Sequence, residues 1–234
     1  MIEQTFEAKL YAPLFYSSSE GRAIRSQPTL SATALMHALG YRYFDMEKRY
    51  AEFGDDATSP DYSHLAEAPF FVTDMRPVAV ETDERTFRST DYRSERHFTT
   101  NDTDLARQVA DTKSVPAILE NSGAAYQTIR NYLGIAPGST FEFTVWSEQE
   151  LPKRPFFRMG IKQTGELRAR ETDLDTLVLN KYLLSEVYEL PDELLTSLME
   201  RSSSFRRGND PRLQHFVGVD PEFVRSEIIP EVLG

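Results

Sequence analysis

The sequence predicts an α+β fold, because strand-like and helix-like periods alternate along the chain. The clearest strand signal is residues 139–146, STFEFTVW, where apolar residues alternate with polar ones, as they do in a half-buried strand. Residues 6–11 alternate in the same way. Between these two segments, apolar residues recur at helical spacing over 30–39 and stop at Gly40. We therefore expect a core built from both kinds of element.

The first strand and the first helix form the opening unit of the chain. One side of the strand carries Phe6, Ala8 and Leu10, and the other carries Glu7, Lys9 and Tyr11. Pro13 ends the strand. Thr29 or Ser31 can cap the helix, and Gly40 can supply a left-handed stop. Residues 41–50 either extend this helix or form a short strand.

Residues 16–27, between the first strand and the first helix, are predicted to form a long polar loop. Small hydroxyls, a flexible glycine and guanidinium groups at such a joint suit an anion, most often a phosphate. The candidate ligands in this loop are Ser18, Ser19, Gly21, Arg22 and Arg25.

Residues 69–80 predict one or two strands, and the stretch after them, 81–103, has a different character. Its arginines are interleaved with Phe87, Tyr92 and Phe98, and it lacks a continuous apolar face. Such a composition favours a protruding arm whose aromatic rings stack on unpaired bases. A solvated hairpin with internal ion pairs is the alternative. The candidate RNA contacts in this arm are Arg88, Arg93, Arg96 and His97.

The second half of the chain predicts further elements and a second basic region. Residues 102–134 indicate helix, ended by Gly134. Residues 152–170 are the most basic stretch and indicate a hairpin that turns at 162–164, although a basic hairpin can also arise without any ligand. Residues 174–184 indicate a strand. The segments 192–199 and 201–212 indicate a short helix and a basic loop. The candidate RNA contacts of the basic hairpin are Arg158, Lys162 and Arg168.

Composition narrows the class of protein. The net charge of −11 argues, taken alone, against a nucleic-acid partner. However, most of the 26 basic residues are arginines, which make bidentate contacts to phosphate. A GC-rich genome gives the same bias, and a salty cytoplasm favours an acidic surface. The chain has no cysteine and no apolar run long enough for a membrane helix. We expect a cytoplasmic protein without a membrane partner.

Sequence motifs for a catalytic or metal centre are absent. The chain contains no phosphate-binding Walker loop and no dinucleotide-binding glycine pattern. The histidines are far apart in sequence, without the spacing of metal ligands, and they are His37, His64, His97 and His215. We therefore expect no metal and no cofactor. Metal-free RNA cleavage stays open, because it needs only a base and an acid beside one 2′-hydroxyl.

The opening of the chain resembles a known family. Residues 13–17 (PLFYS), 20–22 (EGR) and 33–40 (TALMHALG) resemble the N-terminus of the type I-D CRISPR Cascade subunit of the Cas-five group, the Csc-one family. Residues 69–78, 135–146 and 155–168 resemble later segments of that family, in the same order. For a protein of this family, the acidic and arginine-rich composition indicates that the organism is a haloarchaeon or another species with a salty cytoplasm or a GC-rich genome.

The resemblance implies both a fold and a function. The implied fold is a single RNA-binding domain over 1–234, with a modified ferredoxin-like core and a long insertion near 81–135. A thumb-like arm is expected at about 81–103. The implied function is non-catalytic: the subunit binds and caps the crRNA 5′ handle at the foot of Cascade, for RNA-guided DNA recognition in antiviral defence.

The expected partners follow from the same resemblance. They are the crRNA, the large Cascade subunit and the Cas-seven-type backbone subunits, with target DNA met only through the complex. A metal-independent endoribonuclease that processes precursor crRNA is the alternative function. A purely structural interaction module is a third.

Overall fold

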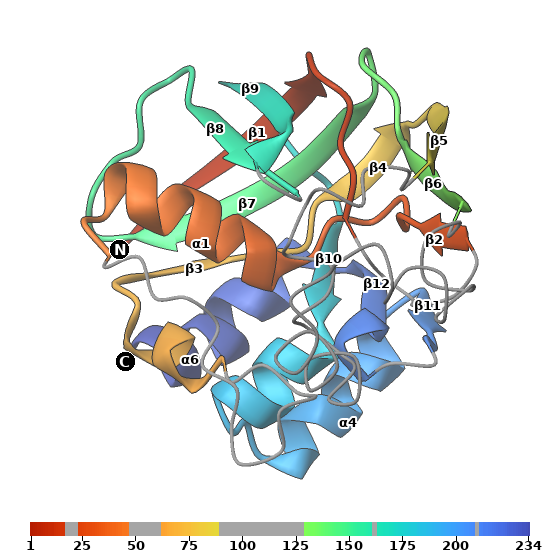
Figure 1. Ribbon diagram of the computed structural model, residues 1–234. Coiled ribbons are helices and arrows are strands. Elements are labelled where there is room, and N and C mark those ends of the chain that lie inside the picture. Colours follow the sequence, from red (N-terminus) through yellow and green to blue (C-terminus); the bar gives the residue numbers. More distant parts are fainter. Residues whose placement is uncertain (17–22, 47–61, 89–128, 161–162, 209–210) are drawn as a thin grey trace, which may run out of the picture.

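The computed structural model describes residues 1–16, 23–46, 62–88, 129–160, 163–208 and 211–234. Within these ranges, helices and strands are mixed, and the strands form three sheets (Figure 1). The α+β prediction is therefore confirmed at this level. No helix in the described ranges combines the length and the apolar character needed to cross a bilayer.

The largest sheet is curled, and all of its pairings are antiparallel. Its strand order is β3 (Phe70–Val72), β7 (Thr140–Ser147), β1 (Ile2–Leu10), β9 (Gly165–Glu171) and β8 (Phe156–Met159), with β4 (Arg76–Ala79) also on β7. The strands predicted at 6–11 and 139–146 are confirmed as β1 and β7. The segment 69–80 forms two strands, and the basic hairpin forms β8 and β9.

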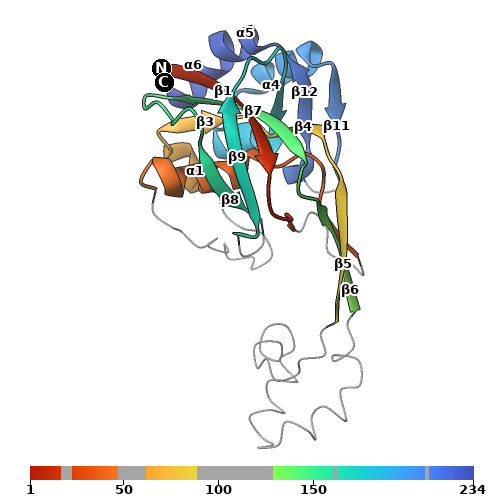
Figure 2. The ribbon, with the colours of Figure 1, turned by 90° about the horizontal axis from the view of Figure 1, so that it is seen from above.

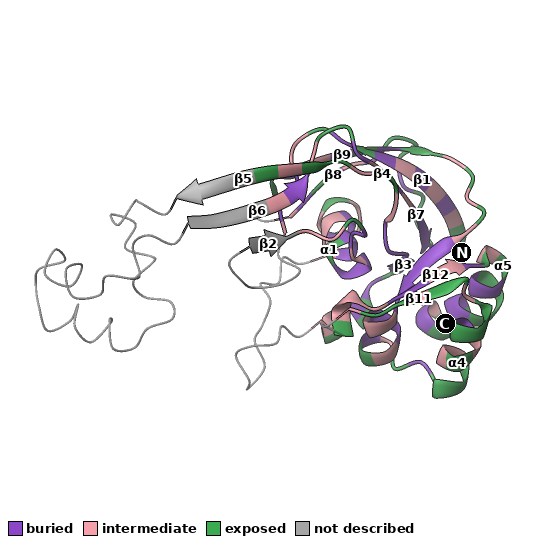
Figure 3. Cartoon of the chain, turned by 90° about the vertical axis from the view of Figure 1, so that its right-hand side faces the viewer, coloured by how far each residue is buried: buried purple, intermediate pink, exposed green. Residues whose placement is uncertain are grey.

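Aromatic side chains fill the inner face of this sheet. Phe6 stacks on Phe143 with ring centroids 5.4 Å apart, and Phe143 meets Phe157 edge to face at 5.9 Å. These rings are fully buried, and buried aromatic pairs contribute beyond their area alone. The same cluster of buried residues continues from β1 to the C-terminal helix α6 (Ile229–Leu233), as the purple segments in Figure 3 indicate.

Helix α1 (Ala32–Tyr43) lies against β8 and β3. Ser31 is its N-cap, since the Ser31 hydroxyl accepts a hydrogen bond from Thr33 N–H. The expected stop at Gly40 is wrong, because the helix continues through it to Tyr43. A side chain at Gly40 would place its Cβ 2.3 Å from Met46 Sδ. This glycine therefore serves close packing and not a left-handed turn.

A second sheet and the C-terminal helices lie below the main sheet in Figure 1. The sheet has the order β10 (Leu177–Asn180), β12 (His215–Val219) and β11 (Ser204–Arg206). The strand predicted over 174–184 is shorter than expected. The Asn180 side chain accepts a hydrogen bond from Leu183 N–H at 3.1 Å, which turns the chain into the π-helical segment Leu183–Val187. The short helix at 192–199 is confirmed as α4 (Asp192–Arg201).

The third sheet extends away from the rest of the molecule (Figures 2 and 3). It has the order β2 (Ala23–Arg25), β6 (Ile129–Ile135) and β5 (Thr82–Arg88). Two predictions are wrong here: part of the loop at 16–27 is strand β2, and residues 129–134 are strand, not helix. Ile129 and Leu133 share a face in a helix and also in a strand, so their spacing did not distinguish the two.

Candidate nucleic-acid interface

The outward face of β1, β9 and β8 gathers basic and aromatic side chains. In β1 the alternate residues Phe6, Ala8 and Leu10 are buried, so the residues between them face away from the core. The strand register then sets their neighbours. Lys9 pairs with Arg168 of β9, and Arg168 pairs with Phe156 of β8. Side chains from three strands therefore meet in one row.

This face forms an open groove of about 930 Å³. Five basic side chains and two acidic ones line it, together with two aromatic rings and two smaller residues. The lining residues are Glu7, Lys9, Tyr11, Thr140, Arg154, Phe156, Arg158, Glu166, Arg168, Ala169 and Arg170. The groove thus has a positive surplus on a protein whose net charge is −11.

Guanidinium groups cover both aromatic rings of the groove. The Arg168 guanidinium carbon lies 4.8 Å from the centroid of the Tyr11 ring. Arg158 and Arg42 approach the Phe156 ring at 6.0 and 5.8 Å, with Arg42 coming from the last turn of α1. Flat rings beside guanidinium groups are the parts from which sites for unpaired nucleobases are built.

Three features fix the β8–β9 hairpin in place. Phe156 N–H donates a hydrogen bond to the Tyr43 hydroxyl at 2.8 Å, and that hydroxyl donates to the Phe156 carbonyl at 2.9 Å. A Cβ at Gly165 would lie 2.1 Å from a Leu14 methyl carbon. Gly160 has a φ of +85°, in the region that favours glycine. The groove is therefore built on a hairpin held closely against helix α1 and the Leu14 segment.

The carboxylates of the groove leave most of its positive charge uncompensated. Glu166 lies 3.2 Å from Arg168 and 3.6 Å from Arg158, and both arginine side chains are more than half exposed. Exposed ion pairs of this kind are weak. Lys9 stands directly opposite Arg168, and like charges in opposite positions destabilise a sheet. An anionic ligand would relieve this repulsion.

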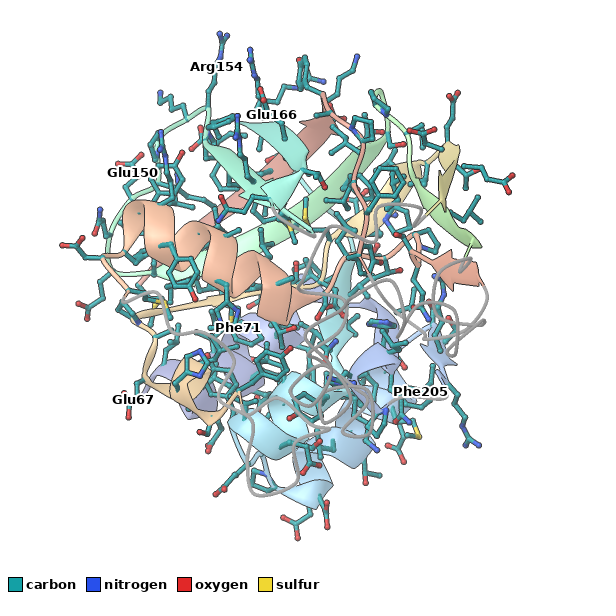
Figure 4. The ribbon with its side chains drawn as sticks, viewed as in Figure 1. Glu67, Phe71, Glu150, Arg154, Glu166 and Phe205 are labelled. Carbon is teal, nitrogen blue, oxygen red and sulfur yellow. The ribbon has the colours of Figure 1, made fainter. Side chains whose placement is uncertain are left out.

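Arg154 adds an unpaired charge at the edge of the groove. It is exposed and makes no ion pair with any other residue in the described ranges. Figure 4 shows Arg154 pointing away from the body of the molecule, on the same side as Glu166. Its position suits contact with a ligand that extends beyond the groove.

The structure brings together two of the predicted RNA contacts. Arg158 and Arg168 both line the groove. Arg25 lies on β2 and Arg88 on β5, but only their backbone is described. The remaining predicted residues lie outside the described ranges, and they are Ser18, Ser19, Gly21, Arg22, Arg93, Arg96, His97 and Lys162.

Sequence reasoning missed several residues of the groove. Lys9, Tyr11, Phe156 and Arg170 were not among the predicted contacts, although two signals pointed to them. The alternation of β1 had placed Lys9 and Tyr11 on the polar side of that strand. The basic stretch 152–170 includes the other two. The missing information was the pairing of β1 with β9, which places these two sets side by side.

A buried polar cluster is the second notable arrangement. Asp74 accepts hydrogen bonds from His215 Nδ1 at 2.6 Å and from Ala32 N–H at 2.6 Å. Burial and the nearby Asp74 charge raise the pKa of Tyr16. His215 and Asp74 are 2% and 0% exposed, so a ribose hydroxyl cannot reach them. The cluster is therefore suited to holding segments together and not to acid–base catalysis on RNA.

Comparison with known proteins gives a family match. The model of a family described as type I-D CRISPR-associated protein Cas5/Csc1 matches residues 1–201. The chain is also similar to a chain in the cryo-EM structure of the Type III-B Cmr-beta bound to cognate target RNA and AMPPnP, state 1. The identity is 12%, the match covers 96% of this chain and 89% of the other, and the TM-score is 0.42.

A chain in the cryo-EM structure of the Type III-B Cmr-beta bound to cognate target RNA is similar at 10% identity. That match covers 99% of this chain and 95% of the other, with a TM-score of 0.38. No curated protein matches the sequence significantly.

Proposed function

Since this chain belongs to the type I-D CRISPR-associated Cas5/Csc1 family of CRISPR effector complexes, we propose that it is a non-catalytic subunit that binds and caps the crRNA 5′ handle. The groove on β1, β9 and β8 carries this proposal. It combines the two requirements of a single-stranded RNA site, a positive track for phosphates and flat rings for bases. Tyr11 and Phe156 supply the rings, and the surrounding arginines supply the charge.

The groove also explains how an acidic protein holds an acidic ligand. Long-range attraction by a molecule of net charge −11 is unfavourable. The basic side chains are instead concentrated on one face, where hydrogen bonds and stacking act at short range. The rest of the surface then repels RNA, which favours one binding orientation.

The proposed RNA contacts extend beyond the groove. In addition to Arg158 and Arg168 of the basic hairpin, which line the groove, they include the first loop with Arg25 and the arm with Arg88. Strands β5 and β6 support the role of the arm, because they project from the body (Figure 2). The arm at about 81–103 is the proposed thumb, which displaces one nucleotide of the guide.

The proposed architecture is one domain over 1–234 with a modified ferredoxin-like core. In its support, α1 follows β1 along the chain, and the β8–β9 hairpin returns beside β1. The modification is that β1 pairs antiparallel with both of its neighbours, unlike the parallel strands of a split βαβ unit. The proposed protein neighbours are the large subunit and the Cas-seven-type backbone subunits, through which target DNA is met.

The test compares two arginines that stand over aromatic rings on different faces. Arg168 lies 4.8 Å from the Tyr11 ring in the groove, and Arg201, the last residue of α4, lies 4.7 Å from the Phe223 ring of α5 (Pro221–Phe223). In filter binding with labelled crRNA that carries its 5′ handle, we expect Arg168→Ala to weaken binding about tenfold. The matched control Arg201→Ala is expected to bind as the wild type does.

Salt dependence separates a phosphate contact from a stacking contact. The logarithm of affinity falls as the logarithm of the salt concentration rises, and loss of one phosphate contact makes this fall shallower by about 0.7 for single strands. Arg168→Ala should show this shallower fall. Tyr11→Ala should weaken binding with the slope unchanged. Equal affinity for the wild type and the Arg158→Ala/Arg168→Ala double variant would show that the groove is not the RNA site.

The non-catalytic part of the proposal has its own readout. Labelled repeat RNA is incubated with the pure full-length protein in EDTA, and its length is followed on a denaturing gel. Retention of intact RNA is the expected result. Site-specific cleavage would favour the endoribonuclease, and no RNA binding at all would favour a structural interaction module.

A further inference from the structure

Two histidines that are distant in sequence meet on the side of α1 that faces η1 (Ser63–Glu67). His37 belongs to α1 and His64 to η1, and 27 positions separate them along the chain. Their Nε2 atoms are 3.0 Å apart, and their rings are inclined at 62°. The sequence did not suggest this meeting, because the two residues lack the spacing of metal ligands.

The hydrogen bond on the far side of His37 fixes the orientation of its ring. The Thr33 carbonyl can only accept, so His37 Nδ1–H donates to it, at 2.7 Å. In the neutral ring this leaves the lone pair of Nε2 directed at His64. A backbone carbonyl that holds the Nδ1 proton is also the usual outer partner of a histidine that ligates a metal through Nε2.

The surroundings favour one class of ligand. Tyr62 and Tyr41 flank the His37 ring, with centroids at 5.9 and 5.7 Å, and both histidines are half-buried. In the described ranges no group of three or more histidine, cysteine, aspartate or glutamate side chains forms a metal cluster. A pair of imidazoles without carboxylates disfavours Mg²⁺ and Ca²⁺, which require oxygen ligands, and suits Zn²⁺, Ni²⁺ or Cu²⁺.

We infer that His37 and His64 form a two-histidine site for a late first-row divalent metal ion, completed by water. Zinc binds histidine nitrogen at about 2.0–2.1 Å with tetrahedral geometry, which separates two ligand nitrogens by about 3.4 Å. The observed separation is 3.0 Å. The two nitrogens therefore have to separate by about 0.4 Å, and each ring has to turn so that its lone pair points at the shared ion and not at the other ring.

Binding through both Nε2 atoms also has a defined proton balance. In the metal-free pair, His37 Nε2 accepts, so His64 Nε2–H donates. When the ion takes both lone pairs, the proton of His64 moves to its Nδ1, and a neutral imidazole remains. No proton is released and no further reactant is required.

The ion would join α1 to η1 and so stabilise the folded chain. The unfolded chain does not hold residues 37 and 64 together, so an ion that binds only the folded form raises the melting temperature. For a chain of this size, zinc at 100 times its dissociation constant should raise Tm by about 5–10 °C. This inference does not depend on the proposed RNA site, because neither histidine lines the groove.

The experiment uses the tag-free full-length protein with zinc chloride as the probe. Calorimetric titration is expected to give one ion per chain for the wild type. Affinity should fall at least tenfold in His37→Gln and in His64→Gln, with the Tm increase lost. Magnesium chloride is the control salt, and it should leave Tm unchanged. The variant His215→Gln is unsuitable as a control because that ring is buried against Asp74.

A measurement on the wild type keeps the inference testable if a variant does not fold. In ¹⁵N-resolved spectra of the histidine side chains, zinc should shift the ring signals of His37 and His64 before those of His215. A pair that is held only by its own hydrogen bond would show no zinc binding. Zinc binding that is equally tight in both variants would place the ion elsewhere. Either result overturns the inference.

Discussion

Glu3 shows how one surface carboxylate joins the two ends of the chain. It accepts a hydrogen bond from Trp146 Nε1–H at 2.9 Å, and its two oxygens accept from Arg225 at 2.7 and 3.0 Å. The Arg225 hydrogen bonds lower the pKa of Glu3, and the Trp146 hydrogen bond acts in the same direction while burial opposes both. The ionised form is therefore stabilised by folding.

This pKa shift predicts a pH-dependent contribution to stability. Glu3→Gln should lower the free energy of unfolding at pH 7 by less than about 1 kcal/mol, because Arg225 is half exposed. Because the pKa of Glu3 is lower in the folded chain than in the unfolded one, its ionised form stabilises the fold at pH values above the unfolded pKa of about 4.3. This contribution is lost as the pH falls through the folded pKa. Urea denaturation at decreasing pH should therefore bring the variant and the wild type together.

The control for Glu3 contacts the same arginine. Glu222 lies 2.5 Å from Arg225, but its side chain is 74% exposed. Glu222→Gln should leave stability nearly unchanged at every pH. A Glu3→Gln effect that persists at low pH would arise from packing and not from charge.

At the scale of elements, the β5–β6 ribbon determines how the proposed thumb can be tested. The two strands pair in register from Thr82 opposite Ile135 to Arg88 opposite Ile129. Ile135 is buried and exchanges backbone hydrogen bonds with Leu14 at 2.9 and 3.0 Å. The ribbon is thus anchored at its base, and it can be shortened without disturbing the anchor.

A shortened ribbon gives a direct prediction. Thr86 and Asn131 are paired neighbours, so residues 87–130 can be replaced by an Asn-Gly turn, which suits a two-residue hairpin. We expect near-native circular dichroism and weaker capture of the crRNA 5′ end. Loss of the fold would show that the removed residues belong to the core. Unchanged capture would leave the groove alone as the RNA site.

At the scale of the whole molecule, the Asp74 cluster links the two main sheets. Asp74 lies between β3 and β4, and it holds the start of α1 through Ala32 and the second sheet through His215 and Asn180. The Asp74 backbone N–H also donates to the Val178 carbonyl at 2.9 Å. The main sheet, the first helix and the C-terminal sheet therefore share one buried carboxylate.

Removal of this carboxylate should destabilise the whole chain. Asp74→Ala leaves the buried donors of His215 and Ala32 without an acceptor, at a cost of about 3–5 kcal/mol. Calorimetry should show a lower Tm and one unfolding transition, as expected for one domain. The matched control is Thr144→Val, because the buried Thr144 hydroxyl lacks a hydrogen-bond partner in the described ranges. The stability of Thr144→Val should be equal to or above that of the wild type. Two or more separate unfolding transitions in Asp74→Ala would contradict the single-domain proposal.

The sequence by itself determined the elements with strong local signals. The alternation in β1 and β7 identified both strands and the buried side of β1, because the period of two is set by the backbone. The hydroxyl residues Thr29 and Ser31 located the start of α1 to within two positions, since a hydroxyl there satisfies a free N–H group, and the structure selects Ser31. The order of motifs indicated the family, which the match over residues 1–201 confirms.

The sequence failed where local pattern and tertiary context disagree. Gly40 has no local signal that separates a packing glycine from a helix stop, and Ile129 and Leu133 fit two kinds of element equally well. The pairing of β6 with β5 and β2 decides that this segment is a strand.

Tertiary structure alone decided which side chains meet. Lys9 and Arg168 come together through the β1–β9 register, and His37 meets His64 through the packing of α1 against η1. Both contacts join residues far apart in the chain. A one-dimensional period reports which face a residue occupies, but not which distant segment lies beside that face. Chain pairing and packing supply that information, so the groove and the histidine pair emerge only in three dimensions.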